Sequence, residues 1–283
     1  MSRVRTLVGT ELLLGAGLIG LVLVAVIVER IFDLRVPVWL SPLVAAGLAG
    51  IPALLWLGFF YLQDRHEPEP KSYILGMFLL GALVSGPVAG FFLDMVHQPH
   101  SHRGIHGPSP EQVVGSLAII AVVQELVKYL LVRSTIYLSK EFDEPMDGIM
   151  YMSAVGIGFA TEENYRYLQG VQGSVFLATG IGNVVITTLA HACFAAVLGY
   201  SLGRAKFSKA SRWAREGSIL GGLLVATCLN AIFGFLERSV KAFGLADEPW
   251  GGLALATAFA AIVFVAISNL MSRQRLHLPS PNV

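Results

Sequence analysis

The chain has 283 residues, of which 54% are hydrophobic and only 14% are charged, and its formal net charge is +1. Soluble domains carry about 25% charged residues, so this composition excludes a water-soluble enzyme with an ordinary surface and indicates a polytopic membrane protein. The net charge itself says nothing about partners; we expect the chain to sit in a lipid bilayer and to bind no nucleic acid.

Eight apolar segments are long enough to cross about 30 Å of hydrocarbon at about 1.5 Å per residue. None alternates like a strand, and unpaired backbone is unfavourable in lipid, so the sequence predicts an all-α bundle of about eight transmembrane helices. We see no internal repeat and expect residues 1–283 to form a single integral membrane domain, with the site-bearing helices at about 112–240. The segments are 6–28, 36–62, 72–96, 112–138, 147–169, 174–203, 217–240 and 250–271.

The first segment follows the basic sequence MSRVR, as in a signal peptide, but no cleavage site ends it, so we interpret it as a retained helix. Lysine and arginine in the short loops predict the orientation. Placing the basic linker 204–215 in the cytoplasm puts 13 basic residues on that side and 6 on the other. Both termini are then cytoplasmic, and the predicted location is the cytoplasmic membrane of a bacterium.

Two loops and two cysteines carry weaker signals. The linker 63–72 contains two prolines and predicts a short charged turn. The linker after the third segment could bind a transition metal, although such loops often do so adventitiously. Cys193 and Cys228 lie in apolar runs, which favours packing residues over a disulfide framework or a thiolate ligand. The histidines of that linker are His97, His100, His102 and His106.

Polar side chains occur at membrane depth in four consecutive helices. Glu125 and Lys128 share a face of the fourth segment at i and i+3, and taken alone they predict an intrahelical ion pair. The next three segments carry Glu163, His191 and Asn230. A carboxylate in hydrocarbon costs at least about 2.5 kcal/mol, so such groups are functional-site candidates and are expected to face one another.

Two chemistries fit a wet pocket of this kind. In the first, Glu163 and His191 hold a divalent metal such as zinc, with an oxygen ligand from Asn230 or Gln124. The metal activates a water molecule, and Glu125 takes its proton as general base. In the second, Glu125 or Glu163 activates water without a metal, and Asn230 or His191 polarises the carbonyl. Both hydrolyse an amide inside the bilayer.

Several motifs resemble those of the PrsW family of intramembrane proteases, which is related to the CAAX prenyl proteases and the bacteriocin-processing group. The motifs are QELVK at 124–128, FATEEN at 159–164, the helix pattern starting with histidine at 191–203 and the EPEP turn at 67–70. The resemblance covers roughly residues 60–240 and implies a bundle of about eight helices. It also implies a set of site residues: Gln124, Glu125, Lys128, Glu163 and His191 as catalytic, and Glu163, His191 and Asn230 as ligands of a divalent metal, with zinc the expected ion.

Two positions depart from the family pattern. The first glutamate of the family's pair is Gln124 here, and Asn230 with Gly234 replaces a motif that resembles HxxxD or HxxxN. The leading hypothesis is an intramembrane endopeptidase that cuts membrane-embedded or membrane-anchored proteins. The alternative is a catalytically impaired pseudoprotease that binds membrane proteins. A third reading, an ion-coupled transporter, would use the same carboxylates but lacks the expected repeat.

Overall fold

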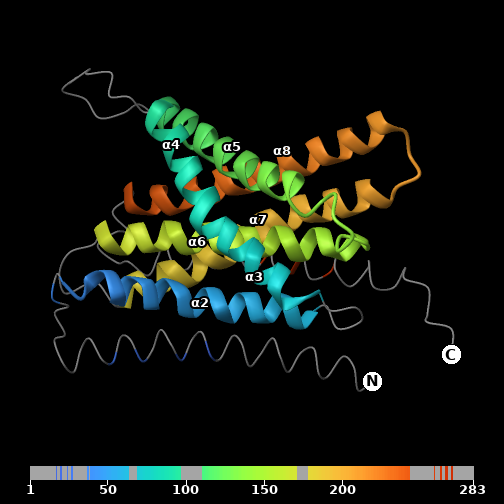
Figure 1. The fold of residues 1–283 in the computed structure, drawn as a ribbon. Helices are drawn as coiled ribbons and strands as arrows, with labels where there is room; N and C mark the ends of the chain where they lie inside the picture. Colours follow the sequence, from blue (N-terminus) through green and yellow to red (C-terminus); the bar gives the residue numbers. More distant parts are fainter. Residues whose placement is uncertain are drawn as a thin grey trace.

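The computed structural model describes residues 39–63, 69–96, 110–170 and 178–242, together with a few isolated positions in the flanking segments. Throughout these ranges the secondary structure is helical, without a strand, in agreement with the predicted fold class. The elements in chain order (Figure 1) are α2 Ser41–Gln63, α3 Lys71–Leu80, the π-helical turn η1 Gly81–Ser85, α4 Gly86–Val96, α5 Pro110–Ser134, α6 Pro145–Gly170, α7 Ala178–Phe207 and α8 Arg212–Ala242.

Five of the predicted segments are confirmed as helices long and apolar enough to cross a membrane. The first and eighth predicted segments, both termini and the histidine-rich linker at 97–106 fall outside the described residues, apart from isolated positions in the two segments. The predicted count of eight and the orientation therefore stay predictions. The five helices are Ser41–Leu62, Lys71–Leu93, Glu111–Ser134, Asn183–Phe207 and Arg212–Glu237.

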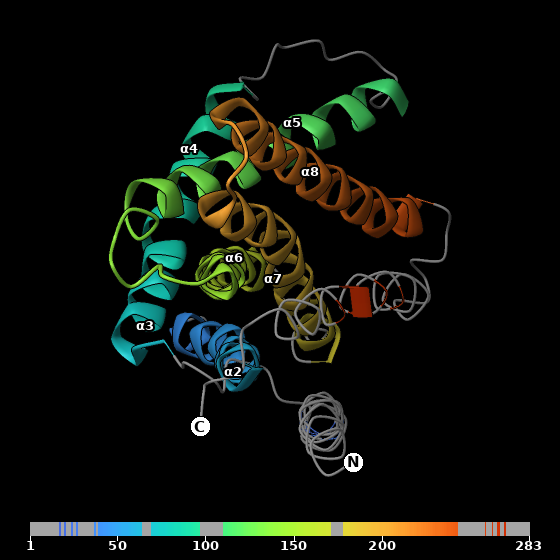
Figure 2. The same cartoon turned by 90° about the vertical axis from the view of Figure 1, so that its right-hand side faces the viewer.

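The helix α6 lies in the middle of the bundle. Figure 2 looks nearly along it, with α2, α3 and α7 around it, and α6 contacts each of them. Every residue from Met146 to Ala160 is buried. The 26 residues of α6 are long enough to span a bilayer, but α6 is not among the five helices that also meet the apolar criterion. The polar residues of this buried stretch, Asp147 and Ser153, therefore face other helices rather than lipid.

The third predicted segment, 72–96, is interrupted by the π-helical turn η1 between α3 and α4. Pro87 follows directly in the first turn of α4. A proline has no N–H and its ring clashes with the carbonyl four residues earlier, so the wider turn before it relieves the helix. The same turn packs closely on α6, because a Cβ atom on Gly81 would lie 2.3 Å from the carbonyl oxygen of Val155.

The hairpin of α7 and α8 differs from its prediction at the turn. The predicted helices end at 203 and begin at 217, but α7 continues to Phe207 and α8 starts at Arg212. Ser211 accounts for the early start, because its Oγ accepts a hydrogen bond from the backbone N–H of Ala214 at 3.3 Å and caps the new helix. Most of the basic linker is thus helical.

Glycines allow α6 and α7 to pack backbone against backbone. A Cβ atom on Gly148 would lie 2.2 Å from the carbonyl oxygen of Gly199, and one on Gly199 would lie 2.1 Å from that of Gly148. A Cβ on Gly203 would similarly meet the carbonyl oxygen of Pro145 at 2.0 Å. Small residues at such contacts are how membrane helices approach closely.

We expect Gly199→Ala to lower the stability of the protein by about 1–3 kcal/mol, because a backbone atom cannot move aside for the new methyl group. The measurement is equilibrium unfolding of the purified protein in detergent. Gly221→Ala in α8 is the matched control, since a Cβ there meets nothing within 4 Å. Equal stability of the two variants would contradict the close contact.

Candidate functional site

The structure brings the polar residues of four helices together inside the bundle. The helix α5 contributes Gln124, Glu125 and Lys128, and α6, α7 and α8 contribute Glu163, His191 and Asn230. All of these residues except Glu163 are buried. The convergence expected from the sequence is therefore present in the fold.

The contact between Glu163 and His191 joins α6 to α7. Glu163 Oε2 lies 2.9 Å from His191 Nε2, and the glutamate side chain is 35% exposed whereas the histidine is 4% exposed. The two atoms are close but not aligned as a hydrogen bond, and the buried Oε2 atom has no hydrogen-bond partner. The carboxylate oxygen therefore lies beside the imidazole nitrogen with lone-pair capacity to spare.

Lys128 fixes the other side of the imidazole ring. Its Nζ lies 2.6 Å from Glu125 Oε1 and 3.3 Å from His191 Nδ1, and the Lys128 and Glu125 side chains are fully buried. The ammonium also lies 5.0 Å from the ring centre of Phe159, which explains the phenylalanine of the FATEEN motif. Because a protonated lysine only donates, Nδ1 accepts and the proton of a neutral imidazole lies on Nε2, facing Glu163.

Two side-chain amides complete the network. Asn230 Nδ2 donates to Gln124 Oε1 at 3.0 Å and to Glu125 Oε1 at 2.8 Å. Gln124 Nε2 in turn donates to Glu163 Oε1 at 3.4 Å. The two residues at which the chain departs from the family pattern therefore contact each other and connect α8 to Glu163.

A cavity of about 100 Å³ opens on this network. Glu163 and His191 line it, whereas Glu125 and Lys128 lie behind its wall. The sequence did not single out Thr187, Phe233 or Glu237 in the wall, because no motif marks them. The full set of lining residues is Leu117, Ile120, Gln124, Glu163, Thr187, His191, Asn230, Phe233, Gly234 and Glu237.

Two neighbours of Glu163 serve the packing of α6 instead. Glu162 pairs with Arg166 at 2.6 Å, and its carboxylate occupies the space that a Cβ on Gly86 would need. Asn164 Nδ2 donates to the carbonyl oxygen of Val184 at 3.2 Å and to Thr188 Oγ1 at 3.0 Å, which ties α6 to α7. Of the two adjacent glutamates, Glu163 is thus the one that faces the cavity.

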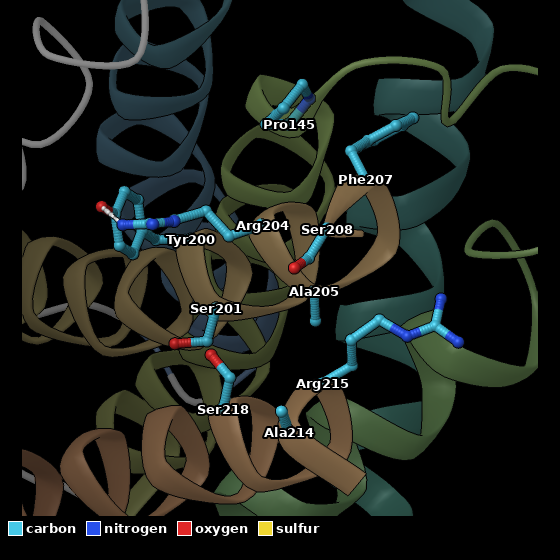
Figure 3. Close-up of a pocket in the computed structure, with 10 residues that line it drawn as sticks. All are labelled: Pro145, Tyr200, Ser201, Arg204, Ala205, Phe207, Ser208, Ala214, Arg215 and Ser218. Atoms are coloured by element: carbon cyan, nitrogen blue, oxygen red, sulfur yellow. Dashed lines mark hydrogen bonds between the residues drawn. The ribbon is translucent and has the colours of Figure 1, made fainter. Parts of the chain in front are cut away.

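A larger cavity, of about 390 Å³, lies elsewhere, at the turn between α7 and α8. Its two arginines do not converge on a common point, because Arg204 extends toward Tyr200 and Arg215 extends the opposite way (Figure 3). The guanidinium of Arg204 donates to the Tyr200 hydroxyl at 2.8 Å. The chemistry of the four-helix network has no counterpart in this second cavity.

Comparison with known proteins identifies the family. Residues 69–271 match the PrsW family, described as intramembrane metalloproteases. The chain belongs to the PrsW family. "Protease PrsW" of Geobacillus kaustophilus is 34% identical over 74% of this chain and 82% of its own length. The protein of the same name from Oceanobacillus iheyensis is 30% identical over 74% of this chain and 88% of its own length. The one from Bacillus subtilis is 29% identical over 70% of this chain and 84% of its own length. No solved structure matches.

The PrsW description implies a metal, and the residues around the cavity fit one in part. A carboxylate oxygen and an imidazole nitrogen are ordinary zinc ligands, and Glu163 Oε2 is a buried atom without a hydrogen-bond partner. His191 Nε2 lies 2.9 Å from it but carries the proton of the neutral ring, so it would have to release that proton to bind a metal. Asn230 Nδ2 is directed at α5, so this residue would have to offer its amide oxygen. Within the described ranges, the group of three or more carboxylate, histidine or cysteine ligands lies elsewhere, at Glu69, Asp143 and Asp147.

Proposed function

We propose that this chain is an intramembrane endopeptidase that hydrolyses peptide bonds of membrane-embedded or membrane-anchored proteins in the cytoplasmic membrane of a bacterium. The observation that carries the proposal is the pair of Glu163 and His191, 2.9 Å apart at the wall of a cavity between membrane helices. Membership of the PrsW family and relatives named as proteases support the reaction class. The cavity is large enough for a few water molecules, each of which needs at least about 10–15 Å³.

Each residue has a proposed role in water attack on a peptide carbonyl. Glu163 orients the water molecule and accepts its proton, since it is the carboxylate that lines the cavity. His191 presents Nε2 to the same space because Lys128 holds the opposite nitrogen. A zinc ion held by Glu163 and His191, with an amide oxygen of Asn230, would add Lewis acidity when bound.

One side-chain amide, that of Gln124, provides a donor that stabilises the developing oxyanion. Each side-chain amide has two N–H donors, and Asn230 directs both of its contacts at α5. Gln124 directs one donor at Glu163 and has a second one available for a substrate carbonyl oxygen. In this scheme Glu125, the general base expected from the sequence, instead keeps Lys128 charged and in place behind the wall.

One observation favours the pseudoprotease. Gln124 is neutral at a position where the family pattern has a second glutamate, and its Nε2 lies 3.4 Å from Glu163 Oε1. The two functions differ in the behaviour of the unmodified chain. As a protease it cleaves; as a pseudoprotease it binds membrane proteins without turnover and gains turnover when the glutamate is restored.

The test compares wild type and Gln124→Glu, each purified and reconstituted into liposomes with a membrane-anchored reporter. We expect the wild-type protein to cleave the reporter at a rate proportional to its concentration. A silent wild type together with an active Gln124→Glu variant would replace the proposed function by the pseudoprotease. Reporter binding, measured by co-purification, serves as the control that substrate reaches both proteins.

A further inference from the structure

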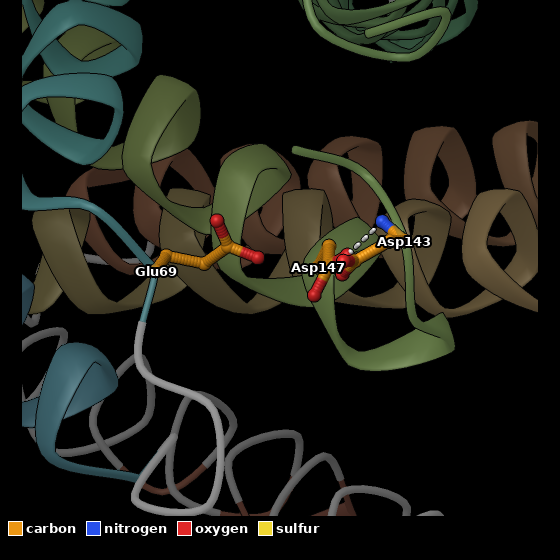
Figure 4. A group of neighbouring side chains, drawn as sticks. All are labelled: Glu69, Asp143 and Asp147. Carbon is orange, nitrogen blue, oxygen red and sulfur yellow. Dashed lines mark hydrogen bonds between the residues drawn. The ribbon is translucent and has the colours of Figure 1, made fainter. Parts of the chain in front are cut away.

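A second group of carboxylates lies far from the cavity, where the chain enters α3 and α6. Glu69 directly precedes Pro70 and α3, Asp143 lies in the turn before α6, and Asp147 is in the first turn of α6. Each offers an oxygen within 4.8 Å of the others. Figure 4 shows the carboxylate of Glu69 directed toward Asp147. Asp147 and Glu163 are 16 residues apart on one helix, which separates the two sites by about 24 Å.

The group contains a buried oxygen with no partner. Asp147 is fully buried, and its Oδ2 accepts hydrogen bonds from the backbone N–H groups of Asp143 and Glu144, both at 2.7 Å. Its Oδ1 has no hydrogen-bond partner. Burying an ionised carboxylate oxygen without a partner is costly, and burial together with the neighbouring Glu69 raises the pKa of Asp147 to about 9. This atom therefore requires either a cation or a proton.

The surroundings favour a cation over further hydrogen bonds. Glu69 is 5% exposed, and the hydroxyl of Tyr151, one turn along α6 from Asp147, donates to it and holds its carboxylate. Lys206 acts electrostatically on Asp143 and Asp147, but its ammonium is bound to the carbonyl oxygens of Tyr137 and Phe142 at 2.7 and 2.5 Å. The ammonium that acts on Asp143 and Asp147 is thus already engaged with two backbone carbonyl groups.

We propose that Glu69, Asp143 and Asp147 bind a divalent cation of the hard, oxygen-preferring class, Mg²⁺ or Ca²⁺. Three carboxylates and no nitrogen or sulfur ligand match these ions rather than zinc. The exposed Asp143 leaves an open side for water molecules to complete the coordination. The bound ion joins the start of α3 to the start of α6, and so fixes the helix that carries Glu163.

The experiment uses the full chain purified in detergent and treated with a chelator. Addition of Ca²⁺ or Mg²⁺ to about 100 times its dissociation constant is expected to raise Tm by about 5 °C. Tb³⁺, a luminescent substitute for Ca²⁺, is expected to bind at one saturable site, with emission excited through Tyr151, and to be displaced by whichever of the two ions occupies the site.

The variants decide whether these three residues form the site. Glu69→Gln and Asp147→Asn are expected to weaken Tb³⁺ binding at least tenfold. Asp143→Asn is expected to have the same effect, and because this residue is exposed the variant tests the site even if the two buried variants fail to fold. Glu111→Gln, which changes an exposed carboxylate on α5, keeps the wild-type response. If the wild-type protein is folded and neither ion changes its Tm, the proposal is wrong. The carboxylates then share a proton instead of binding a cation. Unchanged Tb³⁺ binding in Asp143→Asn would overturn it as well.

Discussion

Replacing Glu163 by glutamine is expected to slow reporter cleavage by about 10²–10⁴-fold, the usual contribution of a general base. Glutamine keeps the size of the side chain but cannot accept the proton of a water molecule. It also removes the charge that faces His191 Nε2 at 2.9 Å. The measurement is the initial rate of cleavage in liposomes, with Tm as evidence that the variant is folded.

The neighbouring residue provides a matched control for this variant. Glu162 has the same side chain one position earlier, but it pairs with Arg166 and does not line the cavity. Glu162→Gln is therefore expected to cleave at nearly the wild-type rate. Wild-type activity in Glu163→Gln would remove Glu163 from the mechanism.

Metal analysis adds a readout that is independent of cleavage. If Glu163 and His191 hold a metal, the double variant Glu163→Gln, His191→Ala loses one equivalent of it. Metal bound by the histidine-rich linker at 97–106 would remain, which distinguishes the two possible binding sites.

Replacing Lys128 by methionine is expected to destabilise the protein by about 3–5 kcal/mol, because removing one member of a buried ion pair leaves the other charge uncompensated. The pair is fully buried, with 2.6 Å between Lys128 Nζ and Glu125 Oε1. Methionine fills a similar volume, so the loss reflects charge rather than packing. Equilibrium unfolding in detergent measures it.

A double variant tests the cause of that destabilisation. Glu125→Gln combined with Lys128→Met removes both charges and is expected to recover most of the lost stability, since the uncompensated carboxylate is gone. If the double variant is as unstable as Lys128→Met alone, the ion pair is not the source of the effect.

The sequence predicted the helices and the depth of the polar residues, because both follow from apolar length and from the cost of charge in lipid. It also favoured Glu163 over Glu162, since Phe159 frames it in a motif, and the structure places Phe159 against Lys128 and the His191 ring. Spacing along a helix gives the face of a residue but not its partner on another helix.

That limit explains what the sequence did not predict. The contact of Asn230 with Gln124 depends on how α8 crosses α5, and the carboxylate group at Glu69 joins two stretches of chain that are 74 to 78 positions apart. The EPEP turn was visible as a pattern, but nothing in the sequence paired it with Asp143 and Asp147. Only the fold shows that they meet.

The central position of α6 has a consequence for how the protein is made. A segment enters the bilayer from the insertion machinery by itself only if its side chains favour lipid, and each charged residue near its middle opposes this. With Asp147, Glu162, Glu163 and Arg166, α6 is poorly suited to enter alone. We therefore expect the insertion of α6 to depend on neighbouring helices that are already in the bilayer. The α2 and α3 helices, which are synthesised first and contact α6 directly, are placed to receive it.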